Sequence, residues 1–395
     1  MSTFIQIHTL TSHSTHCLNR DDIGQPKTVR FLDRNYGRIS SQCQKRSIRE
    51  YMRNTEMTGN TALRTKRLPE MVKKSLLETD VDRKAALSLI PAIAALGEKK
   101  PPSKKVIDDY MKLALKTDIE DDDQKKLTKA ERTPQLFHMK LSEIETIKEV
   151  AFEICQEGGK PDAVAKKFKK TIEKKLKNTN FKDGVDIALF GRMTTSPVFD
   201  DCDAAVPVAH AITTHPILDQ SDFFTAVDDL GGEGEGSGHM DDKAFSAGIF
   251  YRYASVNYDQ LMKNMDQDEG MVKQAVDEFL KAFIMAIPTG SQNSFAAYQQ
   301  PYLVLVTAGT GCPTNLSNAF ADGDTKIANP LKKAAVSLID EYIRIQAFFG
   351  ELKPVEFAGA TCQYDEFLKK DYPDVVIKNS IPKLLDEIGR ISGGK

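Results

Sequence analysis

The chain of 395 residues contains no tryptophan, and only 8% of its residues are aromatic. Proteins that bind single-stranded nucleic acid without sequence preference stack bases on aromatic side chains along a groove. This composition supplies no obvious platform of that kind and disfavours a general single-strand binder. The longest apolar run, residues 87–96, is interrupted by Ser88 and Pro91. Because a membrane-spanning helix needs about 20 apolar residues, the sequence predicts no association with a membrane.

Targeting and disulfide signals are absent as well. The first ten residues, MSTFIQIHTL, have neither a charged leading region nor a small-residue cleavage site, so we predict no signal peptide. The six cysteines are scattered and form no Cys-x-x-Cys pair. This pattern favours reduced thiols over a disulfide framework or a zinc knuckle and predicts a cytoplasmic protein.

Metal and cofactor motifs are missing too. His13, His16 and Cys17 are close in sequence, as are His210 and His215, but neither group has the usual companion ligands of a metal site. Structural polar roles are therefore favoured over metal binding. There is no GxxxxGK[ST] motif for phosphate binding. The stretch GGEGEGSG at 231–238 lacks a preceding strand and a following helix, so we interpret it as a flexible linker. We expect neither a metal nor a cofactor.

No organised acid–base set is visible. Neighbouring carboxylates in a strand or helix point apart, so adjacent pairs are better explained as caps, turn residues or ion-pair partners. Such pairs are Asp21/Asp22, Asp200/Asp201 and Asp228/Asp229. One further carboxylate, Asp33, lies in a basic loop where a bound phosphate could come near.

What the sequence does have is a dense basic segment at residues 20–53. The first sixty residues hold nine Lys or Arg against five Asp or Glu, although the whole chain has a net charge of −2. A local basic surface on a nearly neutral protein indicates a directed site for a polyanion.

The end of this segment predicts a capped helix. Ser40 or Ser41 is a suitable N-cap, and neither Gly nor Pro interrupts residues 42–53. Gln42, Lys45 and Arg49 fall at i, i+3 and i+7 and share one face. A row of donors beside a helix N-terminus suits a phosphate backbone. The alternative is a solvated basic face without a ligand.

Hydrophobic periodicity predicts alternating strands and helices. Strands are expected at 4–10, 185–191, 245–253 and 302–308, and helices at 42–53, 166–177, 272–287 and 330–349. Residues 60–180 are helical and strongly charged. In the helix at 166–177, an apolar stripe runs parallel to a lysine stripe. Residues 194–243 have no clear period and are too long for an ordinary connector, so we expect a functional protrusion or partial disorder.

With the two insertions removed, the order is β-α-β-β-α-β, which is ferredoxin-like or RRM-like. The fold class is therefore expected to be α+β. The aromatic signature of an RRM is absent, so ordinary base stacking on the sheet is not indicated.

Several ordered segments resemble a known family. FIQIHTLTSHSTHCLNRDD, RISSQCQKRSIR, GVDIALFGRM, AHAITTH, FFTAVDDL and FSAGIFYRYA are similar to the CasC family, the backbone subunit of the type I-E CRISPR surveillance complex Cascade. The resemblance extends from residue 4 to about residue 320 and is looser in the lysine-rich insert and beyond 320.

The resemblance implies a modified RRM-like palm that carries helical fingers and a long thumb loop. The palm would comprise residues 1–59, 181–192 and 244–350, the fingers 60–180, the thumb 193–243, and a C-terminal extension 351–395. Copies of such a subunit stack head to tail along a guide RNA. The implied partners are CRISPR RNA, target DNA, other copies of the chain and other Cascade subunits.

The resemblance also assigns site residues. Expected contacts to RNA phosphates are Arg20, Lys27, Ser40, Gln42, Lys45 and Arg49. Met193 is expected as an apolar wedge against bases, and Phe224 and Thr225 as thumb contacts at a kink in the RNA. Because Phe223 adjoins Phe224, this last assignment is uncertain by one position.

The function implied is that of a non-catalytic RNA-binding scaffold in antiviral defence. The alternative is an RNA-cleaving member of the wider backbone superfamily, in which Asp33 would take part in cleavage.

Overall fold

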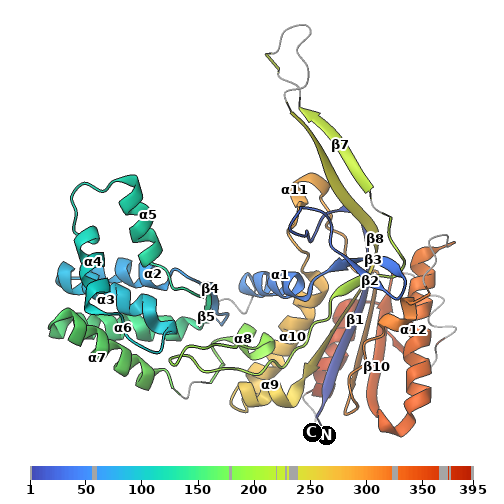
Figure 1. Ribbon diagram of the computed structural model, residues 1–395. Helices are drawn as coiled ribbons and strands as arrows, with labels where there is room; N and C mark the ends of the chain where they lie inside the picture. The colour runs from blue at the N-terminus through green and yellow to red at the C-terminus, as the bar shows by residue number, and fades with distance from the viewer. Residues whose placement is uncertain are drawn as a thin grey trace. The chain divides into compact units, whose positions relative to one another are not determined.

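The computed structural model describes residues 2–55, 60–177, 180–218, 220–226, 229–230, 239–322, 328–363, 372 and 375–392. The chain divides into two compact units (Figure 1). The sheet unit comprises Met1–Glu56, Val206–Leu261 and Glu269–Lys395, and the helical unit comprises Met57–Ala205 and Met262–Asp268.

The sheet unit is organised around a large mixed sheet, which confirms the α+β class. Along the described sheet the strand order is β11-β10-β9-β1-β8-β6-β3-β2, and β7 pairs with β8. The neighbours in this order are antiparallel, except that β10 and β11 are parallel. The strands are β1 (Phe4–His16), β2 (Thr28–Phe31), β3 (Arg34–Ile39), β6 (Ala211–Thr213), β7 (Gln220–Ala226), β8 (His239–Asn257), β9 (Leu303–Gly309), β10 (Val355–Cys362) and β11 (Val376–Ile377).

Helices cover both faces of this sheet. On one face α12 (Pro330–Phe349) buries Leu338 in a cluster with Leu10 of β1 and Leu303 of β9. On the other face lie α1 (Ser41–Arg53) and α10 (Glu269–Met285), which pack against each other. The two faces are separated by the alternation of side chains along each strand, as the period of two in β1 and β8 requires. The remaining helical elements of this unit are α11 (Gln292–Phe295), η2 (Ser317–Phe320), η3 (Gly350–Leu352) and α14 (Ile381–Ser392), and α9 (Tyr258–Asn264) follows β8.

The strand predicted at 185–191 is wrong, because Val185–Phe190 form a helix, α8. Only six residues long, α8 is too short to display a helical period, and Val185, Ile187, Ala188 and Leu189 are all buried, so burial shows no one-sided pattern. The strand that pairs with β8 at this edge is instead β6, in the segment AHAITTH, where a three-residue strand leaves no readable alternation.

The helices expected at residues 60–180 form the helical unit. They are α2 (Leu68–Leu77), α3 (Arg83–Ala94), η1 (Ala95–Gly97), α4 (Lys104–Ala114), α5 (Asp121–Ala130), α6 (Leu141–Glu157) and α7 (Pro161–Lys175), with a small hairpin of β4 (Leu63–Thr65) and β5 (Phe137–Met139). The apolar stripe predicted for α7 is confirmed: Val164, Phe168, Ile172 and Leu176 are all in the core of this unit.

The units do not follow the expected boundaries. Residues 181–192, assigned to the palm, lie in the helical unit together with 193–205, the first part of the expected thumb. The rest of the expected thumb belongs to the sheet unit, where β7 and the first part of β8 form an exposed two-stranded ribbon that extends from the sheet (Figure 1). The glycine-rich stretch 231–238 lies outside the described residues. Beyond residue 351 the chain adds β10, β11 and α14 to the sheet unit.

Candidate nucleic-acid interface

The basic helix forms as predicted, and Ser40 is its N-cap. The backbone of Ser40 is extended (φ −66°, ψ 149°), and its hydroxyl accepts a hydrogen bond from the amide of Cys43 at 3.3 Å. No acidic residue occupies the first turn of α1, so the positive end of the helix is left without a neutralising carboxylate of its own. Ser40 is itself buried. Its contact with RNA stays a prediction.

The predicted donor face of α1 points away from the core. Gln42 is exposed, and Lys45 and Arg49 are half-buried. Burial lowers the pKa of the Lys45 ammonium, which therefore carries its charge in a partly desolvated position. An incompletely hydrated cation loses less water when it meets an anion, so this position favours an electrostatic contact. Ile48 and Met52 of the same helix are completely buried, so the donor row lies beside the packed side of α1.

A buried polar contact fixes the orientation of α1. The side-chain amide of Gln44 donates to the carbonyl oxygen of Ala209 at 2.8 Å, and its oxygen accepts from Nε of Arg252 at 3.1 Å. The Arg252 guanidinium lies 4.5 Å from the ring centroid of Phe283, in α10. Burial lowers the pKa of Arg252 to about 10, so it remains a cation at neutral pH. The helix is thus tied to the sheet and to α10 by specific contacts.

The loop that carries Arg20 and Lys27 is tied to the start of α1. The Lys27 amide donates to the carbonyl of Asn19 at 2.9 Å, and the Asn19 side chain accepts from the Ser40 amide at 2.9 Å. Asp21 accepts from the amides of Ile23 and Gln25, so it is a turn residue, as expected. The fold therefore brings the predicted loop residues and the capped helix together.

Arg38 is a further basic residue at this place, and sequence reasoning missed it. Its amide donates to the Lys27 carbonyl at 2.8 Å, and its guanidinium donates to Nδ1 of His210 at 3.2 Å. Burial, with the charges of Arg38 and Lys27, lowers the pKa of His210. The only signal was its place in the basic segment, because Lys27 is brought to it by the pairing of β2 with β3, and His210 by the pairing of β3 with β6.

Asp33 lies in the two-residue turn between β2 and β3. Its carboxylate pairs with Arg30 at 3.6 Å, and its side chain is almost completely exposed. An exposed carboxylate with an arginine partner lacks the desolvation and positioning that activate a catalytic acid or base.

The predicted apolar contacts lie in different units. Met193 is in the loop after α8 in the helical unit, and 95% of its surface is exposed. Phe224 and Thr225 lie in β7 in the sheet unit, where Phe224 pairs with Asp241 and Thr225 pairs with Met240. Since successive strand residues point to opposite faces, Phe223 and Phe224 cannot substitute for each other. The one-position uncertainty therefore decides which face of the ribbon carries the contact.

The predicted histidine cluster is buried. Burial lowers the pKa of His13 to about 4 and that of His16 to about 3, so both are neutral, and their ring centroids are 5.6 Å apart. Within the described ranges no group of three or more His, Cys, Asp or Glu side chains is placed to hold a metal ion.

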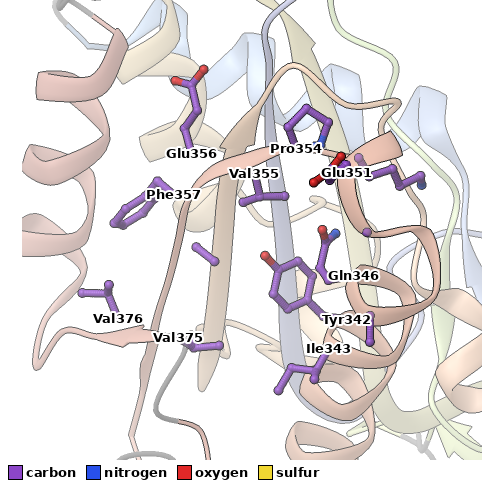
Figure 2. A pocket seen from close by; sticks show the side chains of 14 residues that line it. Tyr342, Ile343, Gln346, Glu351, Pro354, Val355, Glu356, Phe357, Val375 and Val376 are labelled. Carbon is purple, nitrogen blue, oxygen red and sulfur yellow. The ribbon is translucent and has the colours of Figure 1, made fainter.

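A groove of about 760 Å³ opens elsewhere in the sheet unit, between α12 and β10 (Figure 2). Tyr342 and Gln346 line it from α12, and Val355 and Phe357 from β10. It contains none of the predicted site residues.

The family model of CT1975-like proteins (Cas_CT1975) matches residues 5–386. The chain belongs to this family. No curated protein matches it. A chain described as "CRISPR RNA-guided surveillance complex, pre-nicking" is similar to it with a TM-score of 0.80 and 28% identity, covering 98% of this chain and 100% of that one. A second chain, described as "CRISPR RNA-guided surveillance complex", matches with a TM-score of 0.59 and 23% identity, covering 98% of this chain and 99% of that one. This second match shows a shared fold.

These matches confirm the resemblance to a Cascade backbone subunit, while the type I-E subtype stays a prediction. As for membranes, none of the helices in the described residues is long and apolar enough to cross one.

Proposed function

We propose that this protein is a CRISPR RNA-binding backbone subunit of a Cascade-type surveillance complex. The observation that carries the proposal is the end-to-end structural similarity to a chain of an RNA-guided surveillance complex, over 98% of this chain and all of that one. A shared domain alone would leave part of one chain unmatched. The place of action would be the cytoplasm.

The capped helix α1 supplies the grip on RNA. One side of it carries the exposed Gln42 and the half-buried Lys45 and Arg49, and the loop with Arg20 and Lys27 is hydrogen-bonded through Asn19 to the N-cap Ser40. Hydrogen bonds and charge directed at phosphates hold a strand without reading its sequence. A subunit that must accept any guide requires binding of this kind.

The palm of the proposed subunit is RRM-like. The strands β9, β1, β8 and β6 are adjacent and antiparallel, and α1 and α10 belong to the connections, which supports a ferredoxin-like core. The sheet face opposite α1 is covered by α12, which leaves no room for bases to stack on it. RNA would therefore follow the helix side, with the ribbon of β7 and β8 acting as the thumb.

Copies of the subunit would assemble head to tail and present the guide for pairing with target DNA. An extended RNA has a direction, so a closed twofold dimer cannot follow it, whereas a heterologous interface can. The type I-E assignment and the absence of catalysis are parts of the same proposal.

The first test is purification of the protein with its natural partners. Mass measurement should find a guide-sized RNA and further protein subunits, and the RNA should carry many different sequences. A preparation free of nucleic acid, with no affinity for single-stranded RNA at 50 mM salt, would contradict the proposal.

The second test separates the scaffold from the RNA-cleaving alternative. Labelled guide, target RNA and target DNA should all remain intact with the protein and Mg²⁺. Cleavage that disappears in Asp33→Ala would establish the alternative. The exposed position of Asp33 and its pairing with Arg30 favour the scaffold.

A further inference from the structure

The loop that carries Met193 combines a fixed backbone with a free apolar side chain. Gly191 has φ +82°, and a Cβ there would lie 3.0 Å from the carbonyl oxygen of Cys202. The backbone of Arg192 exchanges two hydrogen bonds with Cys202, at 2.9 and 2.8 Å. On the other side of Met193, the amide of Thr194 donates to the Asp201 carboxylate at 2.6 Å. The backbone is therefore held by hydrogen bonds on both sides of Met193.

The Arg192 side chain makes four hydrogen bonds to other parts of the helical unit. It donates two parallel hydrogen bonds to the Glu143 carboxylate, at 2.8 and 3.0 Å, and both side chains are buried. It also donates to the carbonyl oxygens of Asp200 at 2.8 Å and His138 at 3.1 Å. Its guanidinium lies 5.3 Å from the ring centroid of Phe181.

These contacts join three separate parts of the helical unit. Glu143 belongs to the first turn of α6, where its carboxylate also accepts the amide of Lys140 at 2.8 Å. His138 belongs to the small hairpin, and Asp200 to the segment that returns beside the Met193 loop. One guanidinium thus sets the position of the loop relative to α6 and β5.

Stability alone is a poor reason for such an arrangement. A buried ion pair often gives no more stability than well-packed apolar side chains, because desolvation offsets the attraction. What the pair does supply is direction, since a planar guanidinium binds a carboxylate in one orientation. A lysine cannot reproduce this geometry with its single ammonium group.

We propose that Arg192 is a positioning residue that holds Met193 as a fixed apolar wedge against the bases of a bound RNA strand. The inference rests on the proposed function. Unstacking a base costs a few kcal/mol. An apolar wedge can offset this cost only if its backbone does not move away from the base. The ion pair with Glu143 prevents that movement.

The test uses the full chain and single-stranded RNA carrying one 2-aminopurine, scanned along successive positions. The fluorescence of 2-aminopurine rises when the base is unstacked. Wild type should show a several-fold rise at regularly spaced positions. Arg192→Lys and Met193→Ala should each reduce that rise at least twofold, while RNA affinity stays within threefold. The double variant should match Met193→Ala alone, because Arg192 acts through Met193.

Arg67→Lys is the matched control. Arg67 also pairs with a carboxylate of the helical unit, Glu70, but the pair is exposed. This variant should retain the wild-type fluorescence. Glu143→Gln preserves the shape of the side chain and should reduce the fluorescence rise less than Arg192→Lys does. It replaces Arg192→Lys in the test if that variant does not fold.

The inference is overturned if the protein shows the fluorescence rise and neither Arg192→Lys nor Glu143→Gln reduces it. It is also overturned if the double variant loses more of the rise than Met193→Ala alone. Hydrogen exchange without RNA separates this failure from that of the proposed function. The amides of residues 189–196 should exchange at least tenfold faster in Arg192→Lys than in wild type. Glu143→Gln is used if Arg192→Lys does not fold. Exchange rates equal to those of wild type would refute the positioning role. Wild type that binds no RNA refutes the proposed function instead.

Discussion

Two lysine-bearing amphipathic helices, α1 in the sheet unit and α7 in the helical unit, have similar sequence patterns and different surroundings. The first turn of α1 is capped by Ser40, and Lys45 is half-buried with a lowered pKa. The N-cap of α7 is Lys160, which makes no side-chain capping bond. Lys166, Lys170 and Lys174 of α7 are exposed.

Ion pairs occupy some basic side chains on both helices, and on α1 Arg46 pairs with Glu50. On α7, Lys167 pairs with Glu157 and Lys175 pairs with Glu153 of α6, so part of the positive charge is neutralised within the unit. We therefore expect a basic stripe to bind RNA where the fold also supplies a capped terminus and a partly desolvated lysine, as on α1.

The largest expected effect concerns acid stability, which should distinguish the units. His8, His13 and His16 of the sheet unit are buried, and burial lowers their pKa values to about 3, about 4 and about 3. The unfolded chain, with pKa values near 6.5, binds more protons below that pH, so stability falls on acidification from about pH 6.5 towards pH 4. Each histidine that stays neutral in the folded protein lowers the free energy of unfolding by at most about 1.4 kcal/mol per pH unit, so the three together lower it by up to about 4 kcal/mol per pH unit.

Urea unfolding at pH 6.0 and 5.0 measures this loss, and hydrogen exchange should show that the sheet unit opens first. His8→Gln should reduce the pH slope by about a third. An unchanged slope would mean that this histidine titrates normally in the folded protein.

Next in size is the difference in RNA binding between the helices. Lys45→Ala with Arg49→Ala should weaken binding of unrelated single-stranded RNAs by similar factors, on the order of tenfold or more. The slope of log affinity against log salt should fall by about 1.4, or about 0.7 for each lost phosphate contact. Fluorescence anisotropy over a salt series measures both quantities.

The matched control removes two lysines from α7, as Lys166→Ala with Lys170→Ala. It should change affinity less than twofold. Equal losses from both double variants would remove the distinction between the helices, and a loss confined to one RNA sequence would argue against a backbone grip.

The caps of the two helices should respond in opposite directions. Ser40→Ala removes the bond to the Cys43 amide and should destabilise the protein by about 1 kcal/mol. Lys160 has the extended backbone of an N-cap (φ −69°, ψ 138°), so Lys160→Ser should stabilise by up to about 1 kcal/mol. Thermal unfolding of both variants checks the signs. A loss of stability in Lys160→Ser would show that the lysine has a role of its own.

The smallest effect on affinity is expected from the apolar contacts. Met193→Ala with Phe224→Ala should keep affinity within about threefold, because uncharged side chains cannot neutralise phosphate. Chemical probing should lose the periodic exposure of guide bases. Phe223→Ala is the control from the opposite face of the ribbon and should retain the pattern. If the double variant keeps it too, other residues make the kink.

Sequence reasoning succeeded where short-range chemistry decides the outcome. The cap and face of α1, the buried stripe of α7 and the central strands β1, β8 and β9 follow from spacing within a single element. It failed at residues 185–191, where a short, mostly apolar run shows no clear period, and α8 formed instead of a strand. It also missed Arg38, whose neighbours come from a distant strand.

By itself, then, the sequence determined the α+β class, the basic helix and the family, because these depend on composition, local periodicity and ordered motifs. Only the tertiary structure decided that Asp33 is an exposed turn residue, that Phe223 and Phe224 occupy opposite faces, and that Arg192 is bound to Glu143. The physical reason is that strand pairing and burial join residues far apart in the chain. No local pattern records that Arg192 will be buried with a carboxylate 49 residues away.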